Sequence, residues 1–196
     1  MKFKLILAVF ILLSFGAYSQ ESRSKNVITF IYGAASTQED SHGTDGDFFY
    51  RVKGGMTIGL TYTRNFGRHF SVEAGGHYAA DKYTMTSTAF GGLITKNGTI
   101  QMISAEAFAK YNFYKYLFID VGLSVDGQSN YHDSIGIFDQ SGISAEGGFG
   151  GKVKVGQFIF TLNPYIRGHS VLALGRSSAN NQLTTEGVKF GVGFSF

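Results

Sequence analysis

Cysteine and tryptophan are absent from this chain of 196 residues, and proline occurs once, as Pro164. Without cysteine the chain has no disulfide and no thiolate metal site. The absence does not identify the compartment, because many exported proteins also lack cysteine. Proline cannot donate to a sheet ladder, so we expect the strand that contains Pro164 to be distorted there.

Charged residues are also scarce, at 16% of the chain against roughly 25% in typical soluble proteins. The net charge of +3 is too small to indicate a nucleic-acid partner. Glycine and aromatic residues are abundant instead, with 27 Gly, 19 Phe and 11 Tyr, while the mean hydropathy is near zero. This composition favours a sheet with one apolar face and one face of small polar residues.

The first 19 residues have the pattern of an export signal. Lys2 and Lys4 precede a continuous apolar run from Leu5 to Leu13, and Ala17 and Ser19 are the small residues of a cleavage site. The run is shorter than the roughly 20 residues of a transmembrane helix, and no cysteine follows it to carry a lipid anchor. We therefore expect residues 1–19 to be a cleaved signal peptide and residues 20–196 to form a single domain.

Residues 187–196 alternate without exception between an apolar and a small or polar side chain. A strict period of two indicates a β-strand with one apolar face. About ten such residues, tilted, cross the hydrocarbon layer of a bilayer. A strand of a soluble sheet has the same pattern, so this segment alone does not decide between the two.

Seven further segments alternate in the same way, which predicts eight strands at residues 26–36, 51–66, 70–83, 99–113, 117–128, 141–155, 158–168 and 187–196. Three turns of two or three residues alternate with four predicted loops of about 11 to 16 residues, at 37–50, 84–98, 129–140 and 169–184. Short turns at one end and long loops at the other are typical of an outer-membrane barrel. We predict an all-β, eight-stranded, antiparallel up-and-down transmembrane barrel.

A soluble lipocalin-like barrel also has eight strands, but its apolar face points inward. Two features favour a polar interior here. The polar faces contain mostly Gly, Ser and Thr with few charges, whereas a solvated face would carry more Lys and Glu. Aromatic residues gather near the short turns, as expected of a girdle at one membrane interface: Tyr62, Phe66, Phe70, Tyr111, Phe113, Tyr114, Tyr116, Phe118, Phe158, Phe160, Phe194 and Phe196.

The alternation also predicts which charged side chains point into the barrel: Glu73, Glu106, Lys110, Asp120, Glu146, Lys152, Arg167 and Lys189. An interior of eight strands is about wide enough for side chains to fill it. Opposite charges shielded from water should pair, because an unpaired buried charge is costly. We therefore expect a charge network that plugs the lumen; the alternative is that the same charges line a water-filled channel.

The chain resembles the small OmpA-like and OmpX-like outer-membrane barrels that have no periplasmic domain, and residues 188–196 resemble the C-terminal assembly signal of that family. The resemblance implies an outer-membrane location, a signal at Phe190, Phe194 and Phe196, and as partners outer-membrane lipid and the barrel-insertion machinery. It implies no fixed activity. We expect a monomeric, non-enzymatic barrel without cofactor or metal, acting structurally or in surface contact or adhesion; the alternatives are a lipid-modifying barrel enzyme and a small pore.

Residues with catalytic or metal-binding chemistry are few and lie mainly in the predicted loops. The His132-Asp133-Ser134 trio suggests a hydrolase, but consecutive residues rarely converge on one substrate. Asp40, Asp45 and Asp47 could bind calcium, although no bidentate Glu follows them at the spacing of a calcium loop. His42, His132 and His169 could share a metal if their loops meet. The apolar residues 89–94 are expected to pack on neighbouring loops rather than to bind a partner.

Overall fold

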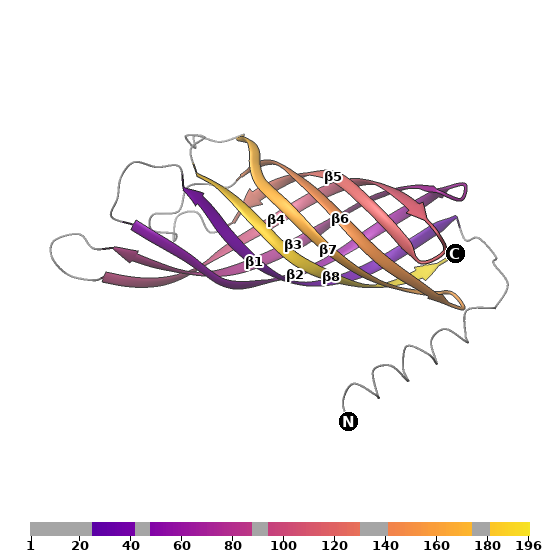
Figure 1. Cartoon of the computed structure of the whole chain (residues 1–196), viewed down its shortest axis with the longest axis horizontal. Coiled ribbons are helices and arrows are strands. Elements are labelled where there is room, and N and C mark those ends of the chain that lie inside the picture. The colour runs from indigo at the N-terminus through magenta and orange to yellow at the C-terminus, as the bar shows by residue number, and fades with distance from the viewer. Residues whose placement is uncertain (1–24, 42–47, 88–93, 130–140, 174–180) are drawn as a thin grey trace, which may run out of the picture.

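The computed structural model describes residues 25–41, 48–87, 94–129, 141–173 and 181–196, and these form a closed antiparallel barrel (Figure 1). The eight strands are β1 (Asn26–Ser41), β2 (Phe48–Phe66), β3 (Phe70–Ser87), β4 (Ile94–Phe113), β5 (Leu117–Gln128), β6 (Gly142–Val155), β7 (Phe158–Ala173) and β8 (Asn181–Ser195). Each strand pairs with its sequence neighbours, and β8 pairs with β1 from Val27↔Ser195 to Ser41↔Asn181. Closure leaves the sheet without an edge. The predicted fold class is therefore confirmed.

The strands are longer than the hydrophobic alternation indicates, and the lengthening is at the end away from the short turns. β1 continues to Ser41, β3 to Ser87 and β7 to Ala173, while β4 begins at Ile94 and β8 at Asn181. Much of the sequence predicted as loop at 37–50, 84–98 and 169–184 is thus strand. Alternation marks only the part of a strand with a continuous apolar outer face, whereas the backbone ladder continues beyond it.

Outward-facing side chains of the barrel are large and apolar. Ile103, Val121 and Leu123 are each about 60% exposed, and their neighbours of opposite parity are buried polar groups such as Ser104, Asp120 and Ser124. A continuous exposed apolar band is unusual for a soluble monomer and fits a lipid-facing surface. Among the described residues, no helix is long and apolar enough to span a membrane.

The aromatic residues of the predicted girdle lie on the outer surface with one clear exception. Tyr62, Phe66, Tyr111 and Phe194 are exposed, but Phe118 is only 3% exposed and lies in the lumen. The prediction was wrong for Phe118 because it counted aromatic residues near a turn without applying the strand's parity. Leu117 and Ile119 face outward on β5, so Phe118 between them faces inward.

Strand β7 departs from regular pairing in two places. Near Pro164, pairing with β6 passes from Gly148↔Tyr165 to Gly151↔Leu162 without a change of register, so the distortion there is a local interruption. The register shifts further along, between Ile143↔Leu172 and Ala145↔Gly168, where three residues of β7 lie opposite one residue of β6. Ser170 in this bulge has φ of 50° and donates its backbone N–H to Ser144 Oγ. His169, at the start of the bulge, keeps the inward parity of Arg167, and both are buried.

Candidate functional site in the charged lumen

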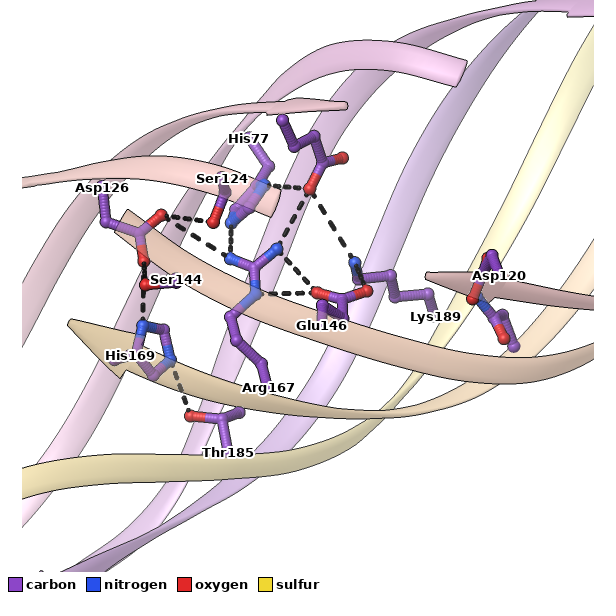
Figure 2. A network of polar contacts seen from close by, with 12 residues as sticks. His77, Asp120, Ser124, Asp126, Ser144, Glu146, Arg167, His169, Thr185 and Lys189 are labelled. Atoms are coloured by element: carbon purple, nitrogen blue, oxygen red, sulfur yellow. Dashed lines mark hydrogen bonds and ion pairs between the residues drawn. The ribbon is translucent and has the colours of Figure 1, made fainter. Parts of the chain in front are cut away.

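Arg167 on β7 is at the centre of a polar network inside the barrel (Figure 2). Its Nε donates to Glu146 Oε2 at 2.7 Å, and its Nη2 donates to Glu106 Oε2 at 3.0 Å. Its Nη1 lies 2.7 Å from His77 Nε2, which can accept that hydrogen bond. Asp126 Oδ1 is 4.0 Å from the same Nη1. The Arg167 side chain is only 4% exposed, so this guanidinium is held by carboxylates and an imidazole rather than by water.

Two contacts of this network join strands on opposite sides of the lumen. Arg167 on β7 meets His77 on β3, and β3 and β7 are opposite each other in a ring of eight strands. Lys189 on β8 forms an ion pair with Glu146 and lies 4.0 Å from Glu106 on β4, which is again the opposite strand. Side chains from facing walls therefore meet in the middle of the barrel at this level.

A second group of charges lies nearer the short turns. Lys110 Nζ is 2.8 Å from Glu73 Oε2 and 3.8 Å from Asp120 Oδ2, and it sits 5.1 Å from the centre of the Phe118 ring. The Thr63 hydroxyl also donates to Glu73. Glu73 and Asp120 flank Lys110 because β3 and β5 are the two neighbours of β4.

Lys152 differs from the other predicted lumen charges. It was expected to pair with a carboxylate, but its Nζ donates instead to the side-chain oxygen of Asn112. Asn112 in turn donates to Ser71 Oγ at 3.0 Å and to the His69 carbonyl oxygen. Near this end of the lumen, the partner of Lys152 is therefore an amide oxygen and not the expected carboxylate.

A third group lies beyond Arg167, toward the long loops. Asp126 Oδ2 is 3.0 Å from His169 Nδ1, and His169 Nε2 is 3.0 Å from Thr185 Oγ1. The hydroxyls of Ser124 and Ser144 donate to the same carboxylate. His169 had been predicted in a loop, where it could share a metal with His42 and His132. It lies instead in β7 and points into the lumen, because the strand continues through the bulge at Ser170.

The hydrogen-bonded chain from Asp126 through His169 to Thr185 has the acid, base and hydroxyl of a catalytic triad. The space around it is too small for a substrate. The cavity beside His169 and Thr185 has a volume of about 10 Å³, which is at most enough for one water. The three side chains are buried. A substrate therefore has no room next to the Thr185 hydroxyl, and the arrangement serves as part of the packed interior.

A larger cavity lies between the Arg167 level and the short turns. Its volume is about 90 Å³, and its walls include Glu73, Phe108, Lys110, Phe118, Lys152 and Asn163. The oxygens Asp120 Oδ1 and Asn163 Oδ1 are buried without a hydrogen-bond partner in the described residues. A polar cavity of this size has room for several waters, which can satisfy such groups. The lumen is therefore filled at the level of Arg167 and hollow on one side of it.

Inward glycines give the large lumen side chains their space. A Cβ on Gly122 would lie 2.3 Å from Phe108 Cδ1, and one on Gly148 would lie 2.4 Å from Asp120 Oδ1. Contacts this short do not occur between real atoms. Small residues on the inner wall are thus a condition for placing an aromatic ring or a carboxylate opposite them.

All eight of the charged residues predicted to face the lumen do so. Glu73, Glu106, Asp120, Glu146, Arg167 and Lys189 are buried, and Lys110 and Lys152 are partly buried. The predicted charge network did not include His77, Asp126 or His169. His77 and Asp126 have the same parity as Glu73 and Asp120, so the alternation of β3 and β5 also predicts that they face the lumen.

The other candidate sites fall partly or wholly outside the described residues. These are His42, Asp45 and Asp47, His132-Asp133-Ser134, and residues 89–93 of the apolar patch; the side chain of Asp40 is likewise not described. Within the described part of the chain, no group of three or more His, Asp or Glu residues could hold a metal ion.

Comparison with known proteins identifies the family. The family described as "outer membrane protein beta-barrel domain" matches residues 5–196. No curated protein sequence matches the chain. Among solved structures, OprG from Pseudomonas aeruginosa is similar at a TM-score of 0.50 and 14% identity, over 88% of this chain and 97% of that one. Ail from Yersinia pestis is similar at a TM-score of 0.44 and 16% identity, over 87% and 99% of the two chains.

At this level of identity, the likeness to OprG concerns the fold alone. The family match covers nearly the whole chain, and it agrees with the closed barrel, the apolar exterior and the charged interior described above. The chain therefore belongs to the outer membrane protein beta-barrel domain family, and its place is the bacterial outer membrane.

Proposed function

We propose that this protein is a non-enzymatic outer-membrane barrel whose lumen is closed by its charge network, and that it acts as a structural or surface-contact protein. The observation that carries the proposal is the pair of contacts across the barrel, Arg167 to His77 and Lys189 to Glu106. Arg167 and Lys189 share the carboxylates of Glu106 and Glu146, so removing either cation would leave buried negative charge without full compensation, which is strongly unfavourable. Ions therefore meet a packed, mutually neutralised layer rather than a water-filled channel.

Recordings in planar bilayers test the closed lumen. We expect the wild-type protein to show no stable large conductance. Arg167→Ala should increase the frequency of opening events, because it removes the guanidinium that bonds Glu106, Glu146 and His77. Lys82→Ala is the control, since Lys82 is an exposed residue of β3 outside the network. Stable large conductance from the wild type would refute the closed lumen and favour the small pore.

The alternative of a lipid-modifying enzyme has little support in the described residues. The Asp126–His169–Thr185 chain is the arrangement nearest to a catalytic one, and its cavity is too small for an acyl chain. A surface role remains the proposal, with outer-membrane lipid and the barrel-insertion machinery as partners. Binding of labelled host and matrix components to intact cells with and without the protein tests it: no difference in binding would leave the structural role alone.

A further inference from the structure

Among the described residues, the exposed charged side chains near the short turns are of one sign. Near the short turns the exposed charged side chains are all cations: Lys25, Arg64, Arg68, Lys115 and Lys154. Apart from the chain's terminal carboxylate at Phe196, no exposed carboxylate lies among the residues described at this end. Glu73, Asp81, Glu106, Asp120, Asp126 and Glu146 are all buried in the lumen. Glu186 is exposed, but it lies further along β8, opposite Ser36 and Ile166.

Three of these cations, Arg64, Arg68 and Lys115, are placed for contact with lipid, and we call them the basic collar. Arg64 lies on the outer face of β2 between Tyr62 and Phe66, which are 41% and 55% exposed. Arg68 and Lys115 are exposed in the two turns that follow β2 and β4. Lys154, in contrast, has the parity of the lumen face and lies at the barrel mouth.

The collar is held in position by local contacts. Arg64 Nη1 donates to Asn26 Oδ1 at 3.0 Å, and the Tyr62 hydroxyl donates to the same oxygen at 2.8 Å. Lys115 Nζ lies 5.8 Å from the centre of the Tyr116 ring. These contacts order the two side-chain stems, and the bond to Asn26 uses only one of the five N–H groups of the Arg64 guanidinium.

Tyrosine and phenylalanine at a membrane interface lie at the depth of the lipid headgroups. Cations beside them reach the phosphates while their stems remain on the apolar surface. Arginine matches a phosphate with two parallel hydrogen bonds. Short turns face the periplasm in this class of barrel, so the collar meets the inner leaflet of the outer membrane.

We propose that the basic collar binds anionic phosphoglycerol lipids of that inner leaflet. The proposal goes beyond the closed lumen and is independent of it. It commits to lipid rather than to the cell wall because Arg64 lies among exposed aromatic residues, where a polysaccharide would have to displace acyl chains.

Electron spin resonance of spin-labelled lipids measures this selectivity. The protein is reconstituted in phosphatidylcholine, and the motionally restricted fraction is compared between labelled phosphatidylglycerol and labelled phosphatidylcholine. A cation near a membrane surface favours an anionic lipid about fivefold. Most lipids around the barrel touch no cation. Averaged over all lipids in contact with the protein, we therefore expect a preference of about two- to threefold for phosphatidylglycerol. In 1 M salt, where the screening length is about 3 Å, the preference should disappear.

Variants locate the effect. Lys115→Gln should weaken the preference, and the triple variant Arg64→Gln, Arg68→Gln, Lys115→Gln should remove it. The matched control is Lys82→Gln, which removes an exposed cation from the other end of the barrel and should leave the preference unchanged. The shift in gel migration between unheated and boiled samples shows that each variant is folded.

Several outcomes would overturn the proposal. These are equal association of the two lipids with the wild type at low salt, an undiminished preference in the triple variant, or a preference lost in Lys82→Gln. Sedimentation with purified peptidoglycan tests the alternative that the collar binds the cell wall, which is the other polyanion facing the short turns. Salt-sensitive retention that depends on the collar, without lipid selectivity, would assign the collar to the cell wall instead.

Discussion

Lys110 is held inside the barrel by a carboxylate on each side. Asp120 is directly opposite it on β5, and Glu73 is diagonal to it on β3, where Ser71 is its direct partner. Glu106, on the same strand as Lys110, is four positions away and contacts Arg167 and His77 instead. Lys110 therefore depends on its neighbouring strands, whereas Glu106 belongs to the contacts across the lumen.

Replacing Lys110 should lower the free energy of unfolding. Lys110→Ala leaves Glu73 and Asp120 without their shared cation, which we expect to cost about 2 to 3 kcal/mol because the site is largely shielded from water. Urea unfolding of the protein in detergent micelles measures this. Combining Lys110→Ala with Glu73→Gln should restore part of the loss, because the unpaired charge is removed and the glutamine oxygen still accepts from Thr63. Equal stability of Lys110→Ala and wild type would show that water already solvates these groups.

Gly148 tests how tightly the inner wall is packed. A methyl group there would lie 2.4 Å from Asp120 Oδ1 and 2.7 Å from Asn163 Oδ1. Gly148→Ala should therefore destabilise the barrel by about 1 to 3 kcal/mol, the usual range for overpacking. Gly147→Ala is a matched control on the adjacent, outward position, where the nearest atom would be 3.9 Å away. Similar melting temperatures for the two variants would contradict the packing described here.

At the scale of one element, β8 closes the barrel and carries the predicted assembly signal. It pairs with β1 along nearly its whole length, and Phe196 N–H donates to the Asn26 carbonyl oxygen at 3.0 Å. Phe194 packs edge to face on Phe158 of β7, with 5.8 Å between ring centres. The aromatic residues of β8 face outward, where another protein could bind them before the barrel closes.

Deletion of Phe196 should abolish assembly while leaving synthesis intact. If the terminal strand is the part recognised for insertion, the truncated chain should be degraded or should aggregate in the periplasm. Surface labelling of whole cells, compared with total protein, measures this. Phe158→Ala removes an exposed aromatic residue at the same end but outside the terminal strand, and should reach the surface. Normal surface levels after deletion would mean that the likeness of residues 188–196 to an assembly signal is incidental.

The strands could be predicted from the sequence where contact with lipid requires apolar residues at alternate positions. All eight strands and the inward parity of the charges follow from alternation, because one face meets acyl chains and the other does not. Beyond residues 36, 83 and 168 the strands continue without a regular alternation of apolar and polar residues, so the prediction ended there. His169 was misplaced for that reason, since β7 was expected to end at Gly168.

Partners across the lumen were beyond sequence reasoning for a different reason. Parity gives the face of a residue, but the stagger of the strands determines its height in the barrel. Arg167 and His77 meet because opposite walls bring them to one level. Lys152 meets Asn112 rather than a carboxylate for the same reason. The predicted lumen residues include four anions and four cations, which suggested that each cation pairs with a carboxylate. The Lys152 ammonium nevertheless binds the side-chain amide of Asn112.

On the scale of the whole molecule, the barrel has apolar side chains outside and ion pairs inside. Ile103, Val121 and Leu123 are exposed, while Glu106, Asp120 and Arg167 are buried. This is the reverse of a soluble barrel, whose apolar side chains fill the interior. Water cannot stabilise such a surface, so the folded state requires a solvent that covers the band and a closed ladder that satisfies the backbone.

The purified protein should therefore fold in detergent or bilayers and not in plain buffer. Once folded, the closed β1–β8 ladder should resist denaturing detergent at room temperature, because exchange of one strand would expose unpaired backbone groups of its two neighbours to an apolar medium. Unheated samples should then migrate differently from boiled ones on a denaturing gel. The Phe196 deletion refolded in parallel separates intrinsic folding from assisted assembly: if it shows the same shift in detergent but fails in cells, the terminal residue acts in recognition. A freely soluble monomer without any shift would contradict the lipid-facing exterior itself.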